Sequence, residues 1–201
     1  SVFKLRQIDE TAAAMGRRAM VHLKIDTGMG RIGIRHENAH QLFAAMQEVR
    51  HTDLCGVYSH FAASHDADHA FTRLQLQRFL DVLEYFPAHG LPMPVRHIAN
   101  SGAILQHEDA ILDMVRPGIM IYGVYPGPEV RRSVDLRPVL SMRSRVVYFK
   151  VVRAGMAIGY DHTWTAESDT RVVTLPVGYG DGYARSLSNR GEVIIHGQRD
   201  T

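Results

Sequence analysis

The stretch Val21-His22-Leu23-Lys24-Ile25-Asp26-Thr27-Gly28-Met29-Gly30-Arg31-Ile32-Gly33 runs from an apolar segment into a glycine-rich turn. Residues 21–26 have the composition of a strand, which the glycines then end. The G-x-G-x-x-G spacing is that of a dinucleotide site, but that site needs a helix that starts within the glycines. The helical pattern here starts later, near Glu37. We therefore expect a strand-to-helix turn, in which Lys24 and Asp26 either line a site at the end of a barrel strand or are solvated.

Strands and helices alternate on both sides of this stretch. Apolar residues at helical spacing predict helices over residues 37–49 and 71–86. Residues 54–61, 95–98 and 114–122 read as further strands. Strands separated by helices imply parallel βαβ units, and several in a row predict a barrel or a doubly wound sheet.

The pattern changes after Gly127. We expect long β structure over residues 139–152 and short strands at 171–177 and 192–196, with no clear amphipathic helix. We therefore divide the chain into an α/β part, residues 1–132, and a mainly β part, residues 133–201. An all-β domain of about 60 residues would be marginally stable by itself.

Composition limits the class of protein. The chain has 201 residues, of which 45% are hydrophobic and 22% charged, which is ordinary for a globular protein. A net charge of +2 argues against a nucleic-acid or membrane-surface partner. We find no apolar run of the roughly 20 residues that span a bilayer, and no signal peptide. The single cysteine, Cys55, fits a reducing compartment.

The chain holds 12 histidines, and several gather with aspartates between His60 and His69. A metal site is conceivable there, but the spacing matches no recognised ligand signature, so we expect a polar loop and no metal. His60 differs from the others because it stands at the end of a predicted strand, which is a catalytic position in barrels.

Two further segments place polar residues after strands. Ser101, in His97-Ile98-Ala99-Asn100-Ser101, can hold a phosphate at a helix N-terminus, or the segment can be an ordinary helix cap. Arg116 is the one charge in Met114–Tyr122, and an unpaired buried charge is costly. Arg116 therefore needs a partner, either a carboxylate or the aromatic nitrogen of a ligand, and we expect it beside His97.

Taken in order, these segments resemble the alanine racemases, pyridoxal-phosphate-dependent enzymes. The resemblance covers essentially the whole chain. It rests on residues 21–33, His97 to Ser101, Arg116 to Gly123, Gly159-Tyr160-Asp161, and Leu175-Pro176-Val177-Gly178-Tyr179-Gly180-Asp181-Gly182-Tyr183. The resemblance implies the C-terminal part of a (β/α)8 TIM-type barrel, followed by the start of a mainly β domain.

The resemblance also implies catalytic roles. Tyr160 matches a catalytic base, and His60 matches a histidine near that tyrosine. Arg31 matches the arginine that steadies the cofactor's phenolic oxygen and the substrate carboxylate, and Tyr179 matches a tyrosine at the substrate entry. Lys24 matches a lysine that is carbamylated in some members, so we expect Lys24 close to Arg31 and neutralised or carbamylated.

For the cofactor, the resemblance implies contacts from five residues. Arg116 matches the partner of the pyridine nitrogen, and His97 matches the residue behind it. Ser101, Gly118 and Ile119 match phosphate contacts. An arginine stays protonated because its pKa exceeds about 12, so it donates to the ring nitrogen without releasing a proton. The ring is then a weaker electron sink, which favours reprotonation of the α-carbon over side reactions.

The implied activity is interconversion of L- and D-alanine by two bases acting on a pyridoxal phosphate imine, which supplies D-alanine for peptidoglycan. The implied assembly is a homodimer with a shared active site, in the cytoplasm or as the catalytic domain of a membrane-anchored protein. A serine or broad-specificity racemase and a non-catalytic pyridoxal-phosphate-binding barrel remain alternatives. We find no match to the family's cofactor lysine, and expect it upstream of Ser1. Asp161 stands where many relatives have glycine.

Overall fold

The computed structural model describes residues 1–200 and divides into two compact units, the first ending at Leu140 and the second beginning at Ser141. The predicted boundary at residue 132 lies a few residues before this division. Among the described residues, no helix is both long and apolar enough to cross a membrane.

The first unit is α/β, with an open sheet in the strand order β2-β1-β3-β4. Its strands are β1 (Ala19–Asp26), β2 (Ile34–Arg35), β3 (Thr52–Tyr58) and β4 (Val95–His97). All three pairings in this sheet are parallel, as the alternation of strands and helices predicts. Its helices are α1 (Val2–Ala14), α2 (Ala39–Glu48), α3 (Ala70–Leu83), α4 (Tyr85–Ala88) and α5 (Ser101–Gln106).

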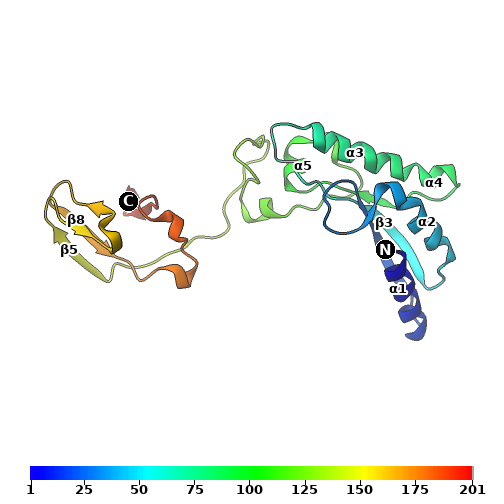
Figure 1. Cartoon of the computed structure of the whole chain (residues 1–201), viewed down its shortest axis with the longest axis horizontal. Helices are drawn as coiled ribbons and strands as arrows, with labels where there is room; N and C mark the ends of the chain where they lie inside the picture. Colours follow the sequence, from blue (N-terminus) through cyan, green and yellow to red (C-terminus); the bar gives the residue numbers. More distant parts are fainter. Residues whose placement is uncertain (201) are drawn as a thin grey trace. The chain divides into compact units, whose positions relative to one another are not determined.

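The two predicted helices are present with adjusted ends. A 3₁₀ turn over His36–Asn38 leads into α2. The helix predicted over residues 71–86 is divided in two at Glu84, and α4 continues nearly in line with α3 (Figure 1). Pro87 is tolerated because it lies in the first turn of α4, where its missing N–H removes no intrahelical hydrogen bond.

Period-2 alternation separates the two faces of the sheet. Ile25, Val57 and Ile98 are completely buried in one hydrophobic cluster with aromatic residues of the helices, Phe43, Phe79 and Phe86. The opposite face carries polar residues at paired positions, because His22 pairs with Gly56, Lys24 with Tyr58, and Tyr58 with His97. One face of this sheet therefore builds the core, and the other presents the chemistry.

The strand predicted over Met114–Tyr122 is wrong. Asp113 and Arg116 donate single backbone hydrogen bonds to Arg96 and Ala99, but no strand forms, and Ile119–Tyr122 is a 3₁₀ turn. Pro117 has no N–H to give to a ladder. The amides of Gly118 and Met120 donate instead to the Ser101 hydroxyl, at 2.9 and 3.3 Å.

The second unit is mainly β, as predicted, with three antiparallel strand pairs: β5 (Tyr148–Val152) with β8 (Thr170–Thr174), β6 (Ala157–Ile158) with β7 (Trp164–Thr165), and β9 (Val193–Ile195) with β10 (Gln198–Asp200). The long β stretch predicted from residue 139 is wrong in its first part. β5 starts only at Tyr148, where β8 supplies a partner for its backbone. Within the described part of this unit, Val152 and Ala166 are the buried hydrophobic residues.

Candidate active site

The glycine-rich turn is held by a side chain from its own strand. The Asp26 carboxylate accepts the amides of Gly28, at 3.0 Å, and Gly30, at 3.0 and 3.1 Å. Burial raises the pKa of Asp26, but these amides outweigh it and bring the pKa below its ordinary value. Gly33 has a φ of 108°, and a Cβ there would lie 2.8 Å from the Lys24 carbonyl oxygen. The glycines therefore form a turn whose amides bind the Asp26 carboxylate. These amides are not available to bind the phosphates of a dinucleotide.

Arg116 lies beside His97, as predicted, and contacts a second histidine. Its Nη1 donates to His97 Nδ1, and its Nη2 donates to the Ser59 carbonyl at 2.6 Å and to His60 Nδ1 at 3.2 Å. Among residues 1–200 it forms no ion pair with a carboxylate. Arg116 is thus a half-buried cation whose protein partners are all neutral.

Burial and neighbouring cations keep both histidines neutral. Burial, together with the charges of Arg116, Lys24 and Arg31, lowers the pKa of His60 to about 4. Burial and the charge of Arg116 likewise lower the pKa of His97 to about 4. A neutral imidazole can accept a hydrogen bond, which a protonated one cannot. Both rings can therefore accept from the Arg116 guanidinium at neutral pH.

Lys24 lies next to this cluster. Its Nζ donates to the Ile25 carbonyl at 3.2 Å, and no ion pair with Asp26 forms in the described chain. Burial lowers the pKa of Lys24 to about 8, against the charge of Asp26 and together with the charges of Arg116 and Arg31. Arg31 itself is exposed, on the turn after Gly30.

Tyr58, which the sequence did not single out, lies against His97, Lys24 and Arg116. Its ring stacks on His97, with centroids 5.0 Å apart and planes at 2°. Lys24 Nζ lies 5.2 Å from the Tyr58 centroid, and Arg116 Cζ lies 5.1 Å from it. Such cation–π contacts favour the charged forms by about 0.5–2 kcal/mol. The available signal was the period-2 spacing of Tyr58 and His60 in the strand predicted over residues 54–61.

Ser101 is buried, and it connects α5 with the segment after Arg116. Its hydroxyl oxygen accepts the Gly118 and Met120 amides, so its own proton remains available to a further acceptor. Asn100 caps α5 by accepting the Ala103 amide, which supports the cap alternative for this segment. Ile119 is exposed on the 3₁₀ turn that follows Gly118.

Tyr160 and Tyr179 belong to the second unit and are exposed, by 97% and 68% of their surface. Each begins a 3₁₀ turn, over Tyr160–His162 and Tyr179–Asp181. Asp161 has a φ of 59°, in the left-handed region. This conformation explains why a glycine suits the position, and why an aspartate, which tolerates it better than most residues, can replace one.

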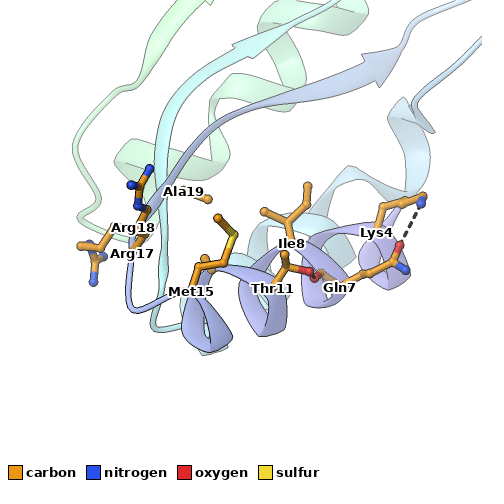
Figure 2. A pocket seen from close by; sticks show the side chains of 9 residues that line it. Lys4, Gln7, Ile8, Thr11, Met15, Arg17, Arg18 and Ala19 are labelled. Atoms are coloured by element: carbon orange, nitrogen blue, oxygen red, sulfur yellow. Dashed lines mark hydrogen bonds between the residues drawn. The ribbon is translucent and has the colours of Figure 1, made fainter.

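Other features lie outside the cluster. His65 and Asp66 form an exposed pair at 3.4 Å, and no group of three or more potential metal ligands gathers anywhere in residues 1–200. A hollow of about 530 Å³ lies between α1 and the start of β1. Figure 2 shows Ile8, Met15 and Ala19 among the residues that line it. It lies at the opposite end of β1 from Lys24.

Comparisons with known proteins agree with this arrangement. The family described as "Alanine racemase, N-terminal domain" matches residues 1–126, and "Alanine racemase, C-terminal domain" matches residues 139–201. The alanine racemase of Chlorobaculum tepidum is 45% identical over 193 residues, covering 96% of this chain and 50% of that protein. This chain thus spans about half the length of the curated relatives it matches.

Solved structures show the same fold. The alanine racemase of Streptomyces lavendulae has a TM-score of 0.87 at 38% identity, covering 99% of this chain and 53% of that one. The Bartonella henselae enzyme, described with covalently bound pyridoxal phosphate, has a TM-score of 0.77 at 26% identity over 99% of this chain and 54% of its own. The predicted fold, a partial (β/α)8 barrel followed by the start of a β domain, is confirmed, and the chain belongs to the alanine racemase family.

Proposed function

We propose that this chain provides half of the active site of a pyridoxal-phosphate-dependent alanine racemase, a cytoplasmic source of D-alanine for cell-wall peptidoglycan. The observation that carries the proposal is Arg116, a half-buried cation with neutral protein partners and no carboxylate in the described chain. Such a group suits an electron-rich, uncharged acceptor, as the nitrogen of a pyridine ring is.

The residues present fit the cofactor at both of its ends. Arg116, steadied by His97, would hold the ring nitrogen. The Ser101 hydroxyl, whose oxygen accepts the Gly118 and Met120 amides, would donate its proton to the phosphate, and the Ile119 amide would donate beside it. When bound, pyridoxal phosphate supplies an electron sink that acidifies the α-hydrogen of an amino acid.

The side chains of this chain then bind, orient and move protons. Arg31 would hold the substrate carboxylate. As a carbamate, Lys24 would carry a negative charge, so it would attract Arg31 where a lysine ammonium would repel it. His60 accepts from Arg116 at Nδ1, so it carries its proton at Nε2 and can donate there. We propose that the Tyr160 oxygen takes or returns the α-proton, and that Tyr179 lines the entry for substrate.

Proton exchange tests the proposal more sharply than net turnover. In D2O, the protein from the complete reading frame should exchange the α-hydrogen of both L-alanine and D-alanine for deuterium. Tyr160→Phe should abolish exchange from L-alanine and spare exchange from D-alanine, through a base on the other face. Tyr148→Phe, an exposed tyrosine of the same unit, is the matched control. Equal loss from both enantiomers, or faster turnover of serine than of alanine, would contradict the assignment.

A further inference from the structure

A hydrogen bond between two histidines joins strands that are not neighbours. His22 is on β1 and His97 on β4, with β3 between them in the sheet. Their rings nevertheless meet, with His22 Nδ1 2.7 Å from His97 Nε2 and the ring centroids 4.9 Å apart. The His22 ring therefore reaches over β3 on the polar face of the sheet.

Gly56 makes this crossing possible. It is the register partner of His22 on β3 and also pairs with Val95 on β4. A Cβ at Gly56 would lie 2.5 Å from His22 Cε1 and 2.8 Å from the Val95 carbonyl oxygen. Any side chain at this position would occupy the space that the His22 ring uses, so the absence of one opens the path.

The donors and acceptors of this chain of contacts have only one consistent direction. The Arg116 guanidinium can only donate, so His97 Nδ1 must accept. Neutral His97 then carries its proton at Nε2, and donates it to His22 Nδ1. His22 in turn carries its proton at Nε2. Because His97 is only 3% exposed, its N–H depends on His22 for a protein partner.

We propose that His22 is a positioning residue, which accepts the His97 proton over Gly56 and so keeps His97 oriented as the acceptor for Arg116. The idea rests on the proposed function, because Arg116 is the group it positions for the cofactor. Without an acceptor at position 22, His97 would have a buried, unsatisfied N–H and would gain by turning away from Arg116. Arg116 would then lose one of its contacts and move more freely.

The hydrogen bond can be measured without the cofactor. In the complete protein labelled with ¹⁵N-histidine, NMR should show a proton on His97 Nε2, none on Nδ1, and an N–N coupling across the bond to His22 Nδ1. The coupling should vanish in His22→Phe, which keeps a ring without an acceptor, and in Gly56→Ala, which keeps every polar group. A proton on His97 Nδ1, or no coupling in the wild type, would overturn the proposal.

Kinetics tests the consequence. His22→Phe and Gly56→Ala should each lower kcat for alanine about tenfold with little change in KM, since neither residue touches substrate. His22→Asn places an amide oxygen near the former Nδ1 and should restore most of the loss. His40→Phe, at an exposed position of α2, should behave as wild type. A wild-type kcat in His22→Phe would refute the positioning role. An inactive wild type that shows the coupling would refute the function alone.

Discussion

At the scale of single residues, one guanidinium organises the candidate site. Arg116 donates to two imidazoles and a carbonyl, and each imidazole accepts because it is neutral. The pKa values of both histidines, lowered to about 4, are therefore part of the same arrangement as the arginine that contacts them.

Arg116→Gln should raise the pKa of His60 and of His97 above about 4, because it removes a nearby positive charge. Burial, the larger cause in both rings, remains, so neither should return to the ordinary value of about 6.5. Titration of the imidazole C–H signals by NMR measures both. Arg6→Gln, which removes an exposed arginine paired with Glu48, should change neither. Unchanged midpoints in Arg116→Gln would contradict this account.

The same pKa values predict a loss of stability in acid. Between pH 6.5 and pH 4, His97 binds a proton in the unfolded chain but not in the folded one. The free energy of unfolding therefore falls as the pH falls through this window. For buried His97 the loss approaches roughly 3 kcal/mol. Urea unfolding at pH 7 and at pH 4.5 should show it, with a smaller difference in Arg116→Gln. Equal differences in the two proteins would contradict it.

Lys24 should be the lysine that reacts with carbon dioxide. Its pKa of about 8 leaves about half of its amine neutral and nucleophilic at that pH. In ¹³C-bicarbonate at pH 8, NMR should show a carbamate carbonyl that weakens as the pH is lowered. Lys24→Arg should remove the signal, and Lys150→Arg, at an exposed position of β5, should keep it. A signal that survives Lys24→Arg would assign the carbamate elsewhere.

At the scale of elements, α3 fixes the ends of two strands through one buried amide. Gln75 Oε1 accepts the Ala62 amide at 2.9 Å, and Nε2 donates to the His60 carbonyl at 3.1 Å and to Thr27 Oγ1 at 3.3 Å. The position of His60 therefore depends on a helix that contributes nothing to the chemistry.

Gln75→Leu should destabilise the chain by about 2–3 kcal/mol, because a side chain of similar size leaves the Ala62 amide and the His60 carbonyl without partners. Urea unfolding measures the loss. Gln77→Leu, two positions along on the exposed side of α3, should stay within about 0.5 kcal/mol of the wild type. Similar effects of the two substitutions would show that the hydrogen bonds of Gln75 contribute little.

At the scale of the whole molecule, the candidate residues are divided between two units. Arg116, His97, His60 and Lys24 belong to the first, and Tyr160 and Tyr179 to the second. We propose that a homodimer completes each site with Tyr160 of the partner.

Mixing two inactive variants tests this arrangement. Tyr160→Phe and Arg116→Ala homodimers, unfolded together and refolded at equal concentrations, should recover about a quarter of wild-type activity. Half of the dimers would be mixed, and each of these would hold one intact site of two. The separately refolded variants provide the baseline. Recovery no greater than that baseline would show that each site is built within one chain.

The sequence by itself determined most of the elements of the first unit. The composition of residues 21–26 predicted a strand, and the apolar spacing near Phe43 and Phe79 predicted helices, all of which are present. It also showed that Arg116 needed a partner. These features are local, since the period of a strand or helix is set by backbone geometry over a few residues.

Only the tertiary structure decided which residues contact one another. Met114–Tyr122 has the composition of a strand, but Ser101, from another element, captures its amides. The roles of Tyr58 and His22 depend on the register of three strands and on the gap at Gly56. Register and competition for hydrogen bonds join residues up to 75 positions apart, so no window of local sequence contains them.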